Sequence, residues 1–247
     1  MKEDRDQPGS GGRRAFLKGA GATLAIAGAA AAPVPSAAQT LLPSPSKDAA
    51  APAAGYQSLG LEEAATTEAL VEHMWPADHL SASGVELGIA TFIDRQLAGG
   101  FGRGDRLYTQ GPFRKGKAQH GYQLPLAPEA WYKAGIAALN AWCGATYKKS
   151  FDRLDATQRE AALLAVSSGK ANAVGGLDLS AWFNGLVYPL FVQGAFADPV
   201  YGGNAGKAAW KMIGYPGLPA TYRSDVVTFR NKRHPKSDAP KSIQDFS

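Results

Sequence analysis

Apolar residues recur along much of the chain at spacings of three and four, the period of a helix with one buried face. The stretches with this period lie at about residues 61–74, 89–97, 128–142, 155–169, 178–191 and 204–214. No stretch shows a sustained alternation of apolar and polar residues, so a sheet core is not expected. The pattern therefore predicts an all-α fold, a single compact domain of about six helices with long Gly- and Pro-rich loops.

Local signals mark the ends of several predicted helices. Pro128 suits a first helical position, because the N–H that it lacks would have no partner there. Asp155 and Gln158 have the spacing of a capping box, and Asp178 is a candidate N-cap. Pro189 lies inside the fifth helix and predicts a kink, since proline cannot donate a backbone hydrogen bond.

Residues 1–38 have the three-part layout of an export signal: a basic start, an apolar middle and small residues at the cleavage site. The twin-arginine pattern is carried by Arg13, Arg14, Phe16, Leu17 and Lys18. The uncharged stretch over 19–32 is shorter than the roughly 20 residues that span a bilayer, which disfavours a membrane anchor. We expect cleavage after Ala38 and export of the already folded chain to the periplasm.

The remaining chain divides into three parts. Residues 39–55 are rich in Ala, Pro and Ser and predict a flexible linker. The helical domain is expected over 56–230, and a polar tail over 231–247 follows it. Inside the domain, about 30 residues from Gly99 to Pro128 carry no helical stripe. A loop of that length in a compact domain usually has a function or contacts a partner.

Composition excludes several kinds of site. With 247 residues, the chain is long enough for one sizeable domain or at most two small ones. A single cysteine cannot form an internal disulfide, hold an iron–sulfur cluster or complete a c-type haem attachment. The formal net charge is +5, of which +3 remains outside residues 1–38, so nucleic acid is not expected as a partner.

The common catalytic signatures are missing from the sequence. Gly100-Phe101-Gly102-Arg103-Gly104-Asp105 places Asp105 where a dinucleotide site needs its third glycine, and no predicted strand precedes it. We therefore expect a flexible loop there. The chain also lacks G-x-x-x-x-G-K-[ST], H-E-x-x-H and G-x-S-x-G. These absences lead us to predict no catalytic and no cofactor-binding residue.

The titratable residues that could carry chemistry are few. His73 and His79 have an acidic neighbour in Asp78, but Pro76 between them prevents a shared helical face of the kind that zinc ligands often use. We expect a solvated helix end and predict no metal site. Cys143 lies in the middle of a predicted helix, which favours a small core hydrophobe over a nucleophile.

One segment, residues 196–217, combines aromatic side chains with turn residues and glycines. The residues that make it a candidate partner interface are Phe196, Asp198, Pro199, Tyr201, Gly202, Gly203, Asn204, Trp210 and Tyr215. Tyrosine and tryptophan on a rigid loop are frequent anchors of protein–protein contacts. The alternative is that the segment only seals a connection between two helices, for which Asn204 is a candidate N-cap. Both interpretations stay open.

Several motifs give the chain a family resemblance. In order, they are Met74-Trp75-Pro76-Ala77-Asp78, Ala90 to Leu97, Gln110-Gly111-Pro112-Phe113, Gly121 to Leu126, and Phe196 to Asn204 with Trp210 to Gly217. Together with the twin-arginine signal, they resemble the gluconate 2-dehydrogenase subunit 3 family, also called the gamma or small subunit. The similarity covers about Leu59 to Val226, and Asp198 to Asn204 is its most specific part.

The resemblance implies a non-catalytic subunit of a membrane-associated periplasmic dehydrogenase of the gluconate 2-dehydrogenase (acceptor) type. In such complexes the large subunit carries FAD and oxidises gluconate or a related polyol, and a multihaem cytochrome c subunit takes the electrons. The small subunit escorts the folded flavoprotein through the twin-arginine translocase. The complex is then held at the inner membrane. Gly12 and the polar tail over 232–247 depart from the family pattern.

Two other classes of function stay open. One is an enzyme without a standard motif, built from loop aromatics with Asp78, His79 or Asp198. The other is a stand-alone periplasmic binding module. A dehydrogenase needs a hydride acceptor and a route for electrons, and this sequence has a recognisable motif for neither. The escort subunit is therefore the favoured hypothesis.

Overall fold

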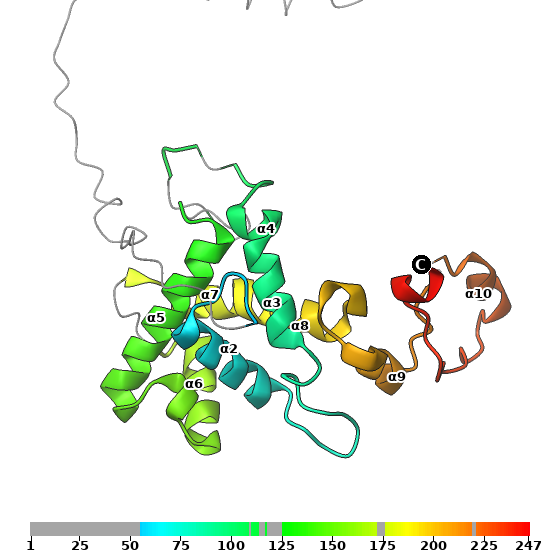
Figure 1. The fold of residues 1–247 in the computed structure, drawn as a ribbon, viewed down its shortest axis with the longest axis horizontal. Helices are drawn as coiled ribbons and strands as arrows, with labels where there is room; N and C mark the ends of the chain where they lie inside the picture. Colours follow the sequence, from blue (N-terminus) through cyan, green and yellow to red (C-terminus); the bar gives the residue numbers. More distant parts are fainter. Residues whose placement is uncertain (1–54, 109, 114–116, 118–124, 172–175, 219–220) are drawn as a thin grey trace, which may run out of the picture. The chain divides into compact units, whose positions relative to one another are not determined.

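The computed structural model describes residues 55–108, 110–113, 117, 125–171, 176–218 and 221–247 (Figure 1). Over these residues the chain consists of helices and connecting segments, with one isolated parallel bridge and no strand. The all-α prediction is therefore confirmed. Within the same ranges, no helix combines the length and the apolar character that crossing a bilayer requires.

All six predicted helices are present. They are α2 (Leu61–Met74), α3 (Ile89–Ala98), α5 (Pro128–Tyr147), α6 (Ala156–Ser167), the continuous run of α7 (Leu179–Trp182), η4 (Phe183–Val187) and α8 (Tyr188–Phe196), and η6 (Ala205–Lys207) with α9 (Ala208–Ile213). Two further helices, α4 (Gly100–Arg103) and α10 (Arg223–Thr228), were not predicted. Single turns are formed by η2 (Phe151–Arg153), η5 (Pro199–Tyr201) and η7 (Ile243–Phe246).

The predicted start signals act as expected. Pro128 is the first residue of α5. Asp155 Oδ1 accepts a 2.9 Å hydrogen bond from the Gln158 N–H, and the Gln158 side chain accepts one from the Asp155 N–H, which completes a capping box. Asp178 Oδ1 accepts from the Ala181 N–H at 2.9 Å and begins α7.

The predicted kink at Pro189 takes the form of a widened turn. Over η4 the helix has the π spacing, and the Tyr188 N–H donates to the Phe183 carbonyl five residues earlier. The α-helical pattern resumes at Tyr188, so the helix continues past the proline without a break. A single π turn of this kind absorbs an irregularity inside an α-helix.

The segment Gly100–Asp105 corrects the expectation of a flexible loop. Its first four residues form α4, which packs against the end of α3. A Cβ atom on Gly102 would lie 1.7 Å from the Leu97 carbonyl oxygen, and Gly104 has a φ of 75°. The glycines therefore allow a tight helix–helix corner and a left-handed cap.

One hydrophobic core lies among α2, α3, α5, α6 and the α7–α8 run (Figure 1). Trp182 and Tyr132 are fully buried at its centre, with ring centroids 6.1 Å apart. The Tyr132 hydroxyl lies 3.0 Å from Thr67 Oγ1, so its polar end is satisfied. Burial raises the pKa of the Tyr132 hydroxyl well above its usual value.

A buried carboxylate ties the beginning of the domain to α3. Asp94, 1% exposed, accepts from the backbone N–H groups of Gln57, Ser58 and Leu59 at 2.8 to 2.9 Å. A buried charge is tolerated when hydrogen bonds satisfy it in this way. The contact ties residues 57–59 into the packed domain.

Candidate partner interface

The candidate segment begins at the end of α8 and runs through η5, η6 and α9. Asp198 Oδ1 accepts a 3.1 Å hydrogen bond from the Val200 N–H and begins η5 together with Pro199. Gly202 then reverses the chain with a φ of 106°, a backbone conformation that side chains disfavour. The resulting Gly-rich loop, residues 198–207, leads into α9.

Three of the predicted interface residues are buried and join α8 to α9. Asn204 is fully buried: its Nδ2 donates to the Ala197 carbonyl, and its Oδ1 accepts from the Ala209 N–H in the first turn of α9, each at 3.0 Å. Trp210, 5% exposed, donates from Nε1 to the Phe196 carbonyl at 2.8 Å. Gly203 is buried too. This half of the segment seals the helix connection, as the second interpretation proposed.

The loop is also fitted closely to the start of α3 and to α8. A Cβ atom on Gly203 would lie 2.2 Å from the Gly194 carbonyl oxygen, and one on Gly88 would lie 2.3 Å from the Gly202 carbonyl oxygen. The Ala205 N–H donates to the Leu87 carbonyl at 3.0 Å. These close backbone approaches explain the run of glycines and fix the loop against the core.

The other half of the segment faces outward. Tyr201 is 52% exposed, and Val200 and Phe196 are 38% and 39% exposed. Phe196 packs edge-on against Trp75, with centroids 6.1 Å apart. Tyr215 is half-buried against Trp210, 5.2 Å between ring centroids. Exposed large apolar side chains on a fixed loop are the features of a contact surface.

The C-terminal tail lies against the same segment, which sequence reasoning missed. The Ile243 N–H donates to Asp198 Oδ2 at 2.9 Å, and Lys207 Nζ pairs with the Asp245 carboxylate. Lys241 exchanges backbone hydrogen bonds with Pro216 and Leu218 at 2.9 and 2.8 Å. Because these contacts join residues far apart in the chain, no local signal marked them.

An aromatic hollow lies between this tail and α10. Tyr222 packs edge-on against Tyr215, 6.3 Å between ring centroids, and donates its hydroxyl to the Gly217 carbonyl at 2.5 Å. Burial and the hydrogen bond with Tyr215 raise the pKa of the Tyr222 hydroxyl to about 12. His234 and Phe229 also line the hollow, and their rings pack edge-on with centroids 4.7 Å apart.

His73 and His79 do not come together. His73 Nε2 lies 2.8 Å from Glu160 Oε2 on α6, whereas His79 is exposed in the turn after α2. Asp78 Oδ1 accepts from the Leu80 N–H, a bond that lowers the pKa of the Asp78 carboxyl. In the described part of the chain, no three His, Cys, Asp or Glu side chains are grouped as metal ligands.

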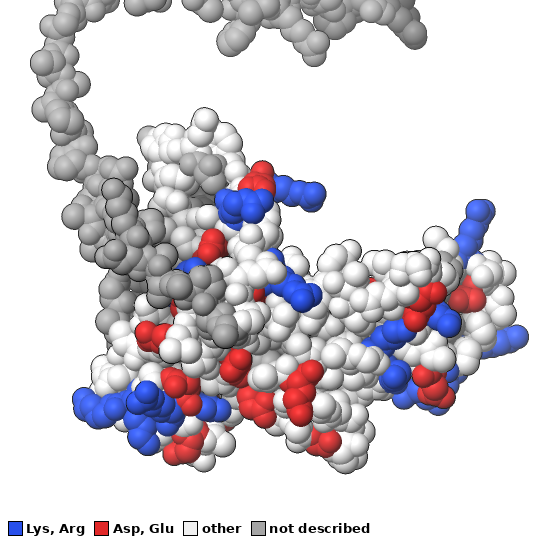
Figure 2. Space-filling model, in the orientation of Figure 1, with Lys and Arg blue, Asp and Glu red and all other residues white. Residues whose placement is uncertain are grey.

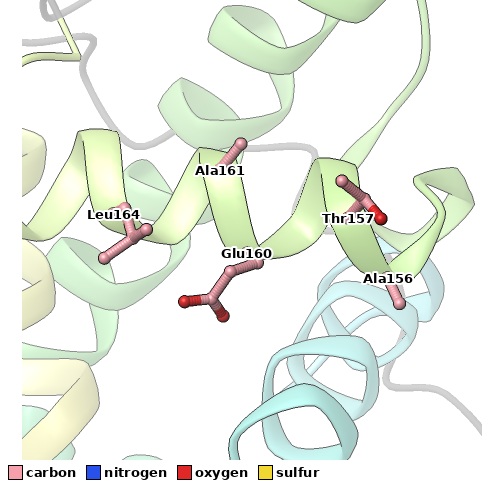
Figure 3. Close-up of a pocket in the computed structure, with 5 residues that line it drawn as sticks. All are labelled: Ala156, Thr157, Glu160, Ala161 and Leu164. Carbon is pink, nitrogen blue, oxygen red and sulfur yellow. The ribbon is translucent and has the colours of Figure 1, made fainter.

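A second surface hollow lies on α6, and Figure 3 shows its lining. The residues are Ala156, Thr157, Glu160, Ala161 and Leu164. Glu160 is the one charged group among them, and it already pairs with His73. Apart from Glu160 and the Thr157 hydroxyl, the lining is apolar.

Cys143 is a core residue, as the sequence predicted. Its side chain is fully buried in the hydrophobic core. Burial raises the pKa of the thiol to about 12, so the thiolate that a nucleophile requires is not formed at neutral pH.

Several of the sequence predictions fall largely or wholly outside the described residues. They are the export-signal residues Arg13, Arg14, Phe16, Leu17 and Lys18, the cleavage after Ala38, the linker over 39–55 apart from Gly55, and most of the Gly121–Leu126 motif. On the face shown in Figure 2, Lys and Arg form separate groups with Asp and Glu between them, and no continuous basic surface is seen there.

Fold and site together define an all-α domain whose Gly-rich loop carries the exposed side chain of Tyr201 on a buried scaffold. The model of the family described as gluconate 2-dehydrogenase subunit 3 matches residues 61–217. The chain therefore belongs to the gluconate 2-dehydrogenase subunit 3 family, and the resemblance seen in the sequence is confirmed. Comparison with curated proteins and with solved structures gave no match. The family match spans α2 to α9 and ends at Gly217, before α10 and the tail.

Proposed function

We propose that the chain is the non-catalytic small subunit of a gluconate 2-dehydrogenase-type complex. It escorts the FAD-containing large subunit through the twin-arginine translocase to the periplasm and stabilises it there. The family match and the twin-arginine pattern at Arg13 and Arg14 support this proposal. FAD and haem c belong to the large subunit and to a multihaem cytochrome c subunit, through which the complex is held at the inner membrane.

The observation that carries the proposal is the outward-facing half of the Gly-rich loop. Tyr201 projects from a turn whose backbone is held by the buried Asn204 and by close packing of glycines. A surface that is ordered before binding loses little conformational entropy when a partner docks. Buried tyrosines at the centre of an interface commonly contribute most of its binding energy. The loop is therefore suited to hold a large folded partner.

The two carboxylates of the enzyme hypothesis, Asp78 and Asp198, already have structural partners. Asp198 uses both carboxylate oxygens on backbone N–H groups, of Val200 and Ile243. Asp78 likewise holds the turn that contains Leu80. Both carboxylates therefore have a structural role in holding the backbone. These hydrogen bonds favour the escort subunit over an enzyme built on the same residues.

Truncation of the exposed tyrosine tests the proposal. We expect Tyr201→Ala to weaken binding to the large subunit by about 2 kcal/mol, which is about 30-fold in Kd, with little change in the thermal midpoint of the lone subunit. The matched control is Tyr188→Ala, because Tyr188 on α8 is 50% exposed and lies outside the loop. Affinity is measured by titration of the purified subunits. A large drop in the thermal midpoint of the Tyr201 variant, with unchanged affinity for the large subunit, would show that the segment only connects two helices.

A further inference from the structure

The C-terminal extension, residues 218–247, lies beyond the family match but contacts the Gly-rich loop inside it. It contains α10 and η7, starts after α9 and comes back to the loop that precedes α9. Pro240 and Ser242 are buried, so this returning segment is packed against the rest of the chain. An extension fitted in this way has a structural or binding role at the loop.

The extension holds both ends of the Gly-rich loop, residues 198–207. At the first end, Asp198 divides its oxygens between the loop and the extension: Oδ1 accepts from Val200 and Oδ2 from Ile243. At the second end, Lys207 Nζ donates to the Pro240 carbonyl at 3.1 Å and to the Asp245 carboxylate. The loop is thus bracketed by contacts with one segment.

Asp245 is itself held in place. Its Oδ2 accepts from the Ser242 N–H at 2.6 Å and from Ser242 Oγ at 3.1 Å. The Lys207 and Asp245 side chains are only 20% and 31% exposed. A partly buried ion pair with further hydrogen bonds keeps its geometry better than an exposed pair.

A third anchor lies just after α9. The Ser237 N–H donates to the Gly214 carbonyl at 3.1 Å, and Lys241 pairs with the backbone on both sides of Gly217. A Cβ atom on Gly217 would lie 2.0 Å from the Lys241 carbonyl oxygen. The backbone at this position is therefore shaped to receive the extension.

The loop has a conformation that needs such support. Asn204 and Lys207 have φ of 50° and 60°, in the left-handed region that non-glycine residues seldom adopt. Surrounding contacts have to keep residues in this region. For Asn204 they come from α8 and α9, whereas for Lys207 the side-chain contacts come from the extension.

The extension also adds apolar surface beside the loop. Because the Ile243 N–H bonds to Asp198, η7 lies directly against η5. Ile243 and Phe246 of η7 are 41% and 66% exposed, and Tyr201 of η5 is 52% exposed. The hydrogen bond between Ile243 and Asp198 thus brings two elements with exposed apolar side chains together, and the Lys207 and Asp245 charges beside them neutralise each other.

We propose that residues 218–247 clamp the Gly-rich loop in the conformation that binds the large subunit and add Phe246 to the contact. The inference rests on the proposed function, since it names a further part of the same docking surface. The large subunit is the occupant because η7 is bonded directly to the loop that is assigned to it. An apolar surface of this kind calls for an apolar patch on the partner.

Two substitutions in the full chain separate the clamp from the contact. Asp245→Asn removes the charge that holds Lys207, and we expect hydrogen exchange of the amides in residues 199–207 to rise at least tenfold while α2 and α5 stay protected. Asp238→Asn is the control, because Asp238 is exposed and none of the ion pairs between described residues involves it. Unchanged exchange in the Asp245 variant and in a chain that ends at Arg230 would overturn the clamp.

Phe246→Ala tests the contact. We expect it to weaken binding to the large subunit at least tenfold and to leave exchange in the loop unchanged. Val227→Ala is the matched control, since Val227 on α10 is 76% exposed and apolar. Equal affinities of the Phe246 variant and the parent for the large subunit would overturn the contact. A variant that binds the large subunit normally but loses self-association of the small subunit would overturn it as well. If the parent chain itself does not bind the large subunit, the proposed function fails, whereas the exchange measurement still decides the clamp.

Discussion

At the scale of single residues, the core of the domain depends on a position without a side chain. A Cβ atom on Gly135 of α5 would lie 2.0 Å from Trp182 Nε1. Trp182 is fully buried at the start of the α7–α8 run, so its ring cannot move out of the way. The crossing of α5 and α7 therefore needs glycine. The apolar period predicted a helix over 128–142, but it could not show which ring covers Gly135.

Gly135→Ala is expected to destabilise the lone subunit by about 1 to 3 kcal/mol, because it overpacks the core. Gly144→Ala on the same helix is the control: its Cβ would meet nothing within 4 Å. That substitution should stabilise the subunit by about 0.5 to 1 kcal/mol through helix propensity. Urea unfolding of both variants measures the difference. Equal stability of the two variants would show that Trp182 does not press on α5.

The Asp245 carboxylate gives the clamp a defined pH dependence. The hydrogen bond from Lys207 and the Ser242 N–H lower the pKa of this carboxyl to about 2. A group whose pKa is lowered in the folded state contributes stability above its unfolded pKa, about 3.9, and loses it as pH falls through the folded value. The contribution is therefore complete from pH 5 upward.

The difference in thermal midpoint between the parent chain and Asp245→Asn should follow this curve. We expect a constant difference from about pH 5 to pH 8, which shrinks as the pH falls from about 4 toward 2. Thermal unfolding followed by circular dichroism at a series of pH values gives the measurement. A difference that first grows below pH 4 would contradict the ion pair with Lys207.

At the scale of elements, the connection between α8 and α9 depends on a buried amide as much as on an aromatic ring. Asn204 bonds to Ala197 at the end of α8 and to Ala209 in α9. Its left-handed backbone would also suit glycine, so the backbone and the side chain can be tested separately. The same connection places Tyr201 outward.

Asn204→Ala should cost about 3 kcal/mol, since it loses two buried hydrogen bonds and adds backbone strain. Asn204→Gly loses the hydrogen bonds alone and should cost about 2 kcal/mol. Chemical denaturation of the lone subunit ranks these variants against Tyr201→Ala, which we expect to be nearly neutral. An alanine variant as stable as the parent would contradict the stabilising role of the Asn204 amide.

The sequence predicted long elements well because their apolar residues repeat. It missed α4, which has only four residues, two of them glycine, and α10, whose adjacent Val226 and Val227 are both exposed. Neither helix presents a periodic buried face, the property that the prediction used.

The candidate site was predicted in part. Its position followed from aromatic and glycine content, but Trp210 and Tyr201 could not be told apart as buried and exposed by residue type. Asp245 was unpredictable because its partner, Lys207, is 38 residues earlier in the chain. Contacts of this kind depend on the packed fold and leave no local pattern.

At the scale of the whole molecule, the proposed function needs both an export signal and a docking surface. In this proposal the signal is the Arg13-Arg14 pair, and the docking surface is the Gly-rich loop with its clamp. An escort needs both parts. A signal without the docking surface would export the small subunit alone, and a docking surface without the signal would leave the complex in the cytoplasm. The central claim is that the export of the large subunit depends on this chain.

The direct measurement is the location of dehydrogenase activity in cells that carry Arg13→Lys together with Arg14→Lys. We expect the large subunit, without a signal of its own, to stay in the cytoplasm, as seen by fractionation and an activity stain, because the pair is the export address. Arg5→Lys is the control, since Arg5 lies outside the pattern. Normal periplasmic activity in the double variant would contradict the escort function.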